Sequence, residues 1–212
     1  MIISVIIPCF NVSEYISECL DSIYSQTYIN IEVIAVDNNS KDDTFNVLLK
    51  IKQNKYPNLI ILQELKKGAC AARNKGLSVA KGEWIQYLDA DDLLQSEKIT
   101  HQVSLIENCK RESVAFVSGA YFSQNSEGLI YKTTTIGTHH PIVNVFVRES
   151  GITSSNLFSK NWLQKVNGWD SALTSSQETD LMLRLVLEGG QVIVDNTPFT
   201  VIRERDAGQI SQ

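Results

Sequence analysis

Three aspartates stand within four residues of one another, at Asp89, Asp91 and Asp92. They follow an apolar, aromatic-rich run, Trp84 to Leu88, which has the length and composition of a buried β-strand. Carboxylates this close together repel one another unless a cation lies among them. Their oxygens suit hard divalent ions such as Mg²⁺ or Mn²⁺. The cluster therefore predicts a divalent-metal site; the alternative is that Asp92 or Ser96 caps the next helix.

The elements around this cluster alternate between strand and helix. Apolar runs predict strands at Ile2 to Ile7, Ile31 to Val36, Leu59 to Leu62 and Trp84 to Leu88. Helical periodicity predicts helices over 13–26, from Asp42 or Asp43 onward, and over 69–81. This order predicts an α/β fold with parallel strands and right-handed crossovers.

The second half of the chain has a less regular pattern. It predicts helices over 97–108, 159–166 and 177–188. Strands are expected at 114–118, 129–133, 153–158, 191–195 and 199–203, while 142–147 fits either a strand or a short helix. We find no linker near residue 119. We therefore expect one domain over 1–212, in which the second half is a layer that shapes the substrate site.

Composition limits the classes of function. The net charge of −5 argues against a nucleic-acid surface, which is normally basic. The four cysteines are scattered, and Cys9, Cys19 and Cys70 lie in apolar settings, which favours buried thiols and a reducing, cytoplasmic compartment. The opening apolar run is too short for a signal peptide. No apolar stretch approaches the roughly 20 residues of a membrane span.

Three loops should meet at one edge of the sheet. Residues 8–11, 37–40 and 89–92 follow the first, second and fourth strands, and ligands of open α/β sheets bind at such carboxyl ends. Phe10 offers an aromatic face and Asp37 a hydrogen-bond acceptor, and Lys66, Lys67 and Arg73 bring positive charge. These groups suit a nucleotide that carries a diphosphate. The chain has no GxGxxG after the first strand and no GxxxxGK[ST], which disfavours dinucleotide oxidoreductases and P-loop enzymes.

Five segments in this order carry a more specific signal: VIIPCFN, AVDNNSKDDT, KKGACAARNKGL, KGEWIQYLDADD and GWDSALTSSQETDLMLRL. Together they resemble family 2 glycosyltransferases of the GT-A fold. The resemblance implies a mixed, mostly parallel sheet flanked by helices, with a nucleotide-sugar part over 1–100 and an acceptor-side part over 101–212. It also implies an inverting, metal-dependent transfer from a nucleotide-sugar donor, usually a UDP-sugar. The acceptor would be a glycan or a lipid-linked glycan in polysaccharide synthesis, which is compatible with peripheral association with the inner membrane face.

The resemblance also assigns roles to individual residues. It implies that Asp91, the last acid of the family's Asp-x-Asp, ligates the metal. Asp37 would hold the base, and Asp89 would face the donor ribose or sugar. The implied substrate-binding set is Pro8, Phe10, Asn11, Glu14, Asp37, Arg73, Asp89 and Asp92.

An inverting transfer needs a general base on the acceptor side. The family usually has Glu-Asp-x-Asp there, and this chain has Gln177-Glu178-Thr179-Asp180. The resemblance therefore implies that Glu178 is the base, with Asp180 as the alternative. Both acids lie in a first helical turn, where acids are common for structural reasons.

The chain departs from the family pattern in two further places. Asn38 stands where a second aspartate is frequent. The tail lacks the family's histidine, and we expect Arg203 or Arg205 to be surface charge rather than a phosphate ligand.

Other residues and functions remain open. His139 and His140 are expected in an exposed loop, and Trp162 and Trp169 in the core or an acceptor pocket. Two alternative functions are a nucleotidyltransferase of similar fold and a module that binds nucleotide sugars without turnover.

Overall fold

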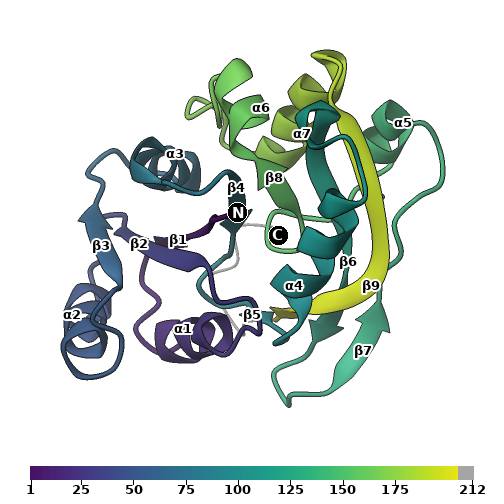
Figure 1. Cartoon of the computed structure of the whole chain (residues 1–212). Coiled ribbons are helices and arrows are strands. Elements are labelled where there is room, and N and C mark those ends of the chain that lie inside the picture. Colours follow the sequence, from purple (N-terminus) through teal and green to yellow (C-terminus); the bar gives the residue numbers. More distant parts are fainter. Residues whose placement is uncertain (205–212) are drawn as a thin grey trace.

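The computed structural model describes residues 1–204 and shows one curved sheet with helices on both faces (Figure 1). The strand order is β3-β2-β1-β4-β8-β6-β9-β5, and β7 pairs with β6. The sheet runs through both halves of the chain, which confirms the predicted mixed, mostly parallel α/β architecture.

The first half contains the predicted parallel strands. The strands are β1 (Ile3–Cys9), β2 (Ile31–Asp37), β3 (Ile60–Gln63) and β4 (Trp84–Tyr87), and the helices between them are α1 (Ile16–Tyr24), α2 (Thr44–Asn54) and α3 (Ala69–Val79). β1 pairs in parallel with β2 on one side and with β4 on the other. The strand order therefore reverses at β1, and ligands of α/β sheets bind at the carboxyl ends beside such a reversal.

The second half continues the sheet from β4. Its strands are β5 (Leu93–Leu94), β6 (Val114–Gln124), β7 (Ile130–Thr133), β8 (Leu157–Ser159) and β9 (Gln191–Arg203). Its helices are α4 (Lys98–Glu107), α5 (Pro141–Phe146), α6 (Lys160–Lys165) and α7 (Gln177–Leu187), with a 3-10 turn, η1 (Arg111–Ser113). β8 is antiparallel to β4 and β6, whereas β9 is parallel to β6.

Three predictions for the second half need correction or completion. The two closing strands predicted at 191–195 and 199–203 are one strand, β9, which follows β6 with a register shift near Gly119. The strand predicted at 153–158 begins only at Leu157, because residues 153–155 form a turn. The ambiguous segment at 142–147 is the helix α5, in which Pro141 occupies the first turn.

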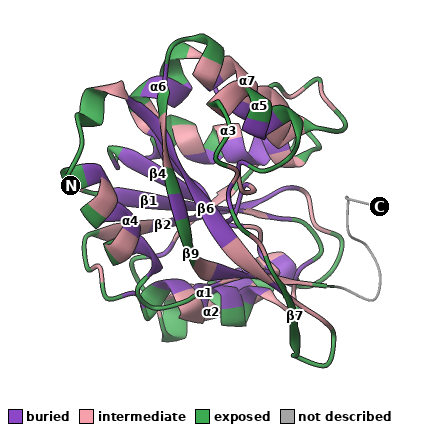
Figure 2. Cartoon of the chain, turned by 90° about the vertical axis from the view of Figure 1, so that its right-hand side faces the viewer, coloured by how far each residue is buried: buried purple, intermediate pink, exposed green. Residues whose placement is uncertain are grey.

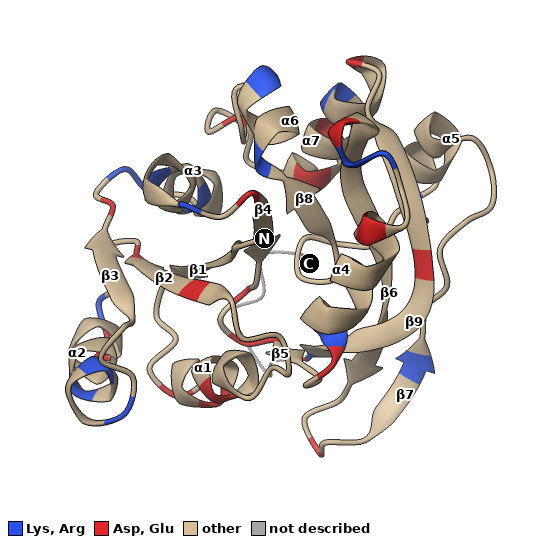
Figure 3. Ribbon diagram, viewed as in Figure 1, with Lys and Arg blue, Asp and Glu red and all other residues tan. Residues whose placement is uncertain are grey.

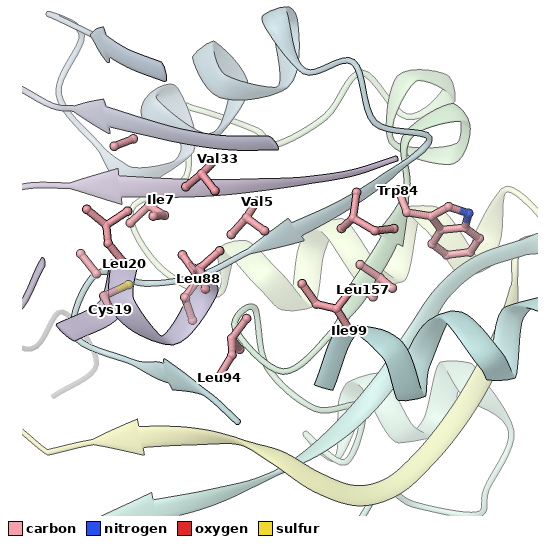
Figure 4. Close-up of a cluster of buried hydrophobic side chains, with 14 of the residues drawn as sticks. Val5, Ile7, Cys19, Leu20, Val33, Trp84, Leu88, Leu94, Ile99 and Leu157 are labelled. Atoms are coloured by element: carbon pink, nitrogen blue, oxygen red, sulfur yellow. The ribbon is translucent and has the colours of Figure 1, made fainter. Parts of the chain in front are cut away.

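The sheet separates two apolar clusters, one on each face. The cluster shown in Figure 4 joins β1 and β4 to α1, α2 and α4, and it includes Val5, Ile7, Leu20 and Ile99. The other cluster joins the sheet to α3, α6 and α7, and it includes Ile6 from β1. Alternate β1 side chains thus enter opposite clusters, as the period-two pattern of a strand requires.

Burial follows this layering, since the inner strands β1, β4, β6 and β8 are largely buried, whereas β7 is exposed and β9 is only partly buried (Figure 2). Trp162 and Trp169 are both buried in the second cluster. His139 and His140 are exposed, as predicted. Among residues 1–204, no helix has both the length and the apolar character that crossing a membrane requires.

Candidate active site

The carboxyl ends of β1 and β2 form one connected edge. Cys9 lies opposite Asp37 in the parallel pair. The following loops bond to each other, since Asn11 N donates to Ser40 Oγ at 3.1 Å and Asn11 Oδ1 accepts from Lys41 N at 2.8 Å. Asn11 adopts φ 52°, a left-handed conformation that asparagine tolerates better than most residues. The two predicted loops therefore meet, as expected.

Asp37 offers an unsatisfied acceptor at this edge. Its side chain is buried, and Asp37 Oδ1 has no hydrogen-bond partner within residues 1–204. An unpaired buried acceptor costs free energy, so a ligand N–H or O–H would stabilise it. Beside it, Pro8 near the end of β1 is half-buried, Asn11 and Glu14 after β1 are exposed, and the Phe10 ring is 52% exposed. An exposed ring beside a buried acceptor suits a heterocyclic base.

Asn38 has a structural role that explains its departure from the family pattern. Its Nδ2 donates to Glu64 O and to Lys66 O, both at 2.8 Å. Its Oδ1 accepts from Gly68 N at 2.8 Å, where Gly68 adopts φ 119° before α3. An ionised aspartate accepts but does not donate, so it could not hold the two carbonyls. Asn38 therefore fixes the loop that leads into α3.

Arg73 and Asp89 form a partly buried ion pair. Arg73 Nη2 lies 2.7 Å from Asp89 Oδ1, and the guanidinium lies over the Trp169 ring at 4.6 Å from its centroid. Burial alone would lower the pKa of Arg73, but the charge of Asp89, followed by smaller contributions that include Glu178, raises it. Asp89 is more exposed than Arg73 and remains reachable for a ligand.

Asp92 points into the protein. It is 4% exposed, its Oδ2 accepts from Ser154 Oγ at 2.7 Å, and its Oδ1 accepts from Arg203 N at 3.3 Å. Burial and then the charges of Asp89 and Asp91 raise the pKa of Asp92 well above its usual range. The helix α4 has Glu97 as its N-cap and no side-chain cap, so the alternative capping role of Asp92 or Ser96 is wrong.

Arg203 closes over the acidic loop, contrary to the expectation of surface charge. Its side chain is only 15% exposed, Nε donates to Asp91 O, and Nη1 pairs with Glu18 on α1. The guanidinium also lies over the Tyr15 ring at 5.6 Å. Figure 3 shows acidic residues on α1 and beside β5, two elements joined by the bond from Leu94 N to Ser22 Oγ. Arg205 lies outside the described residues.

The acidic loop has the chemistry for a divalent cation, but it does not form a complete protein site. Asp89 and Asp91 place two carboxylates next to the buried Asp92, whose pKa is raised first by burial and then by these two charges. Within residues 1–204, no group of three or more His, Cys, Asp or Glu side chains could hold a metal ion. A cation at Asp91 would therefore need further oxygen ligands from a substrate, as Mg²⁺ commonly does with phosphates.

Glu178 is held on the other side of this loop. Thr153 donates to Glu178 Oε2 through its backbone N at 3.0 Å and its Oγ1 at 2.8 Å. Within the described chain, Glu178 Oε1 accepts no hydrogen bond. The charge of Glu178 acts on both Arg73 and Tyr121. Glu178 therefore lies near the Arg73–Asp89 pair and has one carboxylate oxygen available.

Asp180 is engaged differently. Its Oδ2 accepts from Arg184 Nε at 3.0 Å and from Nη2 at 2.7 Å within α7. Arg184 Nη1 in turn donates to Val166 O at 2.6 Å and Gly168 O at 2.9 Å. Asp180 thus holds Arg184 against the loop after α6. This arrangement favours Glu178 over Asp180 as a proton acceptor.

Ser154 connects the two parts of the site and was not anticipated. Its Oγ donates to Asp92 Oδ2 and accepts from Asp89 N at 3.1 Å, while the preceding Thr153 holds Glu178. One turn thus positions both the acidic loop and the candidate base. The signal was present in the polar run Thr153-Ser154-Ser155-Asn156, which is unusual inside a strand buried on both faces.

Comparison with known proteins identifies the fold and the family of this arrangement. The model described as Glycosyl transferase family 2 matches residues 4–170. Over 121 residues the chain is 38% identical to WfaP of Escherichia coli, a UDP-Glc:alpha-D-GlcNAc-diphosphoundecaprenol beta-1,3-glucosyltransferase, covering 57% of this chain and 46% of WfaP. The chain spans less than half the length of the first curated relatives it matches.

Two solved structures share the fold. One is S. aureus TarS 1-349 in complex with UDP-GlcNAc, with a TM-score of 0.79 at 19% identity, covering 100% of this chain and 61% of the other. The second is the mannosyltransferase PcManGT from Pyrobaculum calidifontis in complex with GDP-Man and Mn²⁺, with a TM-score of 0.72 at 20% identity, covering 97% and 58%. At these identities the likeness concerns the fold alone.

Proposed function

The chain belongs to glycosyl transferase family 2, and from that premise we propose that it is an inverting glycosyltransferase that uses a nucleotide-diphosphate sugar, most simply a UDP-sugar. The observation that carries the proposal is the position of Glu178, held by Thr153 while the adjacent Ser154 holds the acidic loop. A base and a loop suited to diphosphate are thus fixed by one turn.

The residues divide the work as follows. Asp37 accepts a hydrogen bond from the base of the nucleotide, against the exposed Phe10 ring. Asp89, oriented by Arg73, hydrogen-bonds the ribose or the transferred sugar. Asp92, which is buried, positions the loop beside the substrate rather than contacting it.

The chemical step is a direct displacement. The acceptor hydroxyl oxygen attacks the anomeric carbon from the side opposite the diphosphate, the bond from that carbon to the diphosphate oxygen breaks, and Glu178 Oε1 takes the hydroxyl proton. Attack from the opposite side inverts the anomeric configuration. A divalent cation held by Asp91 and the donor oxygens would supply positive charge to the departing diphosphate.

The relatives support a proposal for the acceptor and the setting. WfaP acts on a diphosphoundecaprenol-linked sugar, and we take a glycan carried on a lipid or polymer as the acceptor class here. Synthesis would then occur on the cytoplasmic side, with peripheral contact to the membrane. We also propose that residues 1–100 form the donor part and 101–212 the acceptor part of one domain.

The test is donor binding followed by turnover. UDP-, GDP- and dTDP-sugars are each added with Mn²⁺, and we expect one to raise the melting temperature by about 5 °C or more at a hundredfold excess over its Kd. The same sugar should release its nucleotide when an acceptor extract is supplied. The proposal is refuted if none of the donors gives metal-dependent stabilisation. If a donor binds but its nucleotide is not released, the protein binds nucleotide sugars without turnover.

A further inference from the structure

A second concave site lies on the acceptor side of the sheet. It has a volume of about 270 Å³. One side is formed by the end of β7 and the loop that follows it, and the other side by the segment after α5. Its lining includes Tyr121, Lys132, Thr135, Arg148 and Gly151. Small-molecule sites begin at roughly 300 Å³, so this pocket fits a fragment of a larger ligand.

Two residues connect this pocket to the candidate base. Tyr121 lines the pocket, and burial followed by the charge of Glu178 raises the pKa of its phenol. Gly151 also lines the pocket and stands two residues before Thr153, which holds Glu178. The pocket therefore shares Tyr121 and the segment from Gly151 to Thr153 with the surroundings of Glu178.

The pocket carries two cations that make no ion pair within the described residues. Lys132 and Arg148 are both exposed, and neither makes an ion pair within the described residues. Glu149 is the one acidic residue of the lining, and its carboxylate lies beside Gly137. The lining thus has a net charge of +1 in a chain whose net charge is −5.

Arg148 also has an unusual backbone. Its φ is 61°, in the left-handed region that side chains other than glycine and asparagine rarely adopt. This conformation ends α5 in a Schellman motif, in which Glu149 N donates to Asn144 O at 2.8 Å and Arg148 N donates to Val145 O at 3.3 Å. The motif fixes the backbone of the segment that contributes Arg148 to the pocket.

We propose that this pocket binds a phosphate group of the acceptor, with Lys132 and Arg148 as the cationic ligands and Thr135 as a hydroxyl donor. The proposal rests on the proposed function, because it assigns the second substrate of the same transfer. An acceptor phosphate held here would orient the neighbouring sugar hydroxyl toward Glu178. The ligand class is a phosphate ester, attached either to a lipid or to a soluble polymer.

Calorimetry tests the pocket directly. Protein saturated with UDP and Mg²⁺, so that the donor side is filled, is titrated with glycerol 1-phosphate. We expect one saturable site that weakens about fivefold in Lys132→Gln and in Arg148→Gln, the effect of losing one exposed charge contact. Arg148→Lys, which keeps the charge, should bind within about twofold of the parent. The matched control is Lys75→Gln, an exposed lysine on α3, which should not change the affinity.

The outcomes separate this proposal from the previous one. Protein that binds none of UDP, GDP and dTDP refutes the glycosyltransferase proposal, and protein that prefers GDP or dTDP is saturated with that nucleotide in the titration. Protein that binds UDP but no glycerol 1-phosphate, or whose Lys132 and Arg148 variants bind it as tightly as the parent, overturns the phosphate pocket. A parallel titration with octyl phosphate identifies the source, because binding at least about tenfold tighter indicates a lipid-linked phosphate and equal binding indicates a soluble polymer.

Discussion

Thr153 holds one carboxylate oxygen of Glu178 with both of its donors, the backbone N at 3.0 Å and Oγ1 at 2.8 Å. The arrangement fixes Glu178 Oε2 and leaves Oε1 without a hydrogen bond within residues 1–204. The next residue, Ser154, binds Asp92 and the backbone of Asp89. The separation between the proposed base and the acidic loop is therefore set by two consecutive residues.

Replacing Thr153 by valine removes one of these two bonds without changing the shape of the side chain. A hydrogen bond to a charged group contributes about 1.5–3 kcal/mol, so we expect kcat to fall about tenfold or more. The KM for the donor should stay within a factor of about two, because Glu178 does not hold the nucleotide. Thr153→Ser keeps the hydroxyl and is the control. Equal kcat in both variants and the parent would show that the Oγ1 bond is unimportant.

Glu178→Gln should lower the rate of transfer, whereas Asp180→Asn should mainly lower the stability of the fold. A general base contributes roughly 10²–10⁴ in rate, so transfer by Glu178→Gln should fall by at least about a hundredfold while Mn²⁺-dependent UDP binding persists. Asp180→Asn weakens the contact with Arg184 and should mainly lower the midpoint of urea unfolding. Steady-state rates and unfolding curves measured on both variants decide the matter. The reverse pattern would make Asp180 the base.

Asn38→Asp restores the residue that is frequent in the family, yet we expect it to destabilise this protein. The new carboxylate would face Glu64 O and Lys66 O, which now accept from Asn38 Nδ2. Losing both donors in a buried site should lower the free energy of unfolding by about 2 kcal/mol or more. Asn39→Asp is the matched control, since Asn39 is only partly buried and already adopts φ 64°. Urea titrations that show equal stability for the two variants would contradict this role of Asn38.

The regular parts of this site could be predicted because their signals are local. The strand at Trp84 and the loops after β1, β2 and β4 follow from apolar runs and turn residues that are contiguous in the sequence. The Thr153–Ser154 turn and the enclosed Arg203 could not be predicted in the same way. Their roles depend on partners 25 to 112 positions away in the chain, which no periodicity reveals.

Lys98 in α4 is buried although the apolar periodicity of that helix does not include it, and its burial leads to a prediction on pH. Helical periodicity places Ile99, Val103 and Ile106 on the inner face of α4, but Lys98 is also buried, at 1% exposure, and donates to Gln86 Oε1. Burial, opposed by the charge of Asp195, lowers the pKa of Lys98 from 10.5 to about 7. The folded chain therefore releases a proton near pH 7 that the unfolded chain keeps until about pH 10.

The sign follows from this difference in bound protons. Between pH 7 and 10 the unfolded state binds more protons, so this group makes the folded state more stable as pH rises, by at most ~1.4 kcal/mol per pH unit. Lys98→Met removes the titrating amine and should remove that slope, whereas Lys75→Met, at an exposed position on α3, should keep it. The measurement is the free energy of unfolding in urea at pH 7, 8 and 9, taken as the difference between each variant and the parent. A difference between Lys98→Met and the parent that does not change with pH would mean that Lys98 stays protonated in the folded protein, held by Gln86 and Asp195.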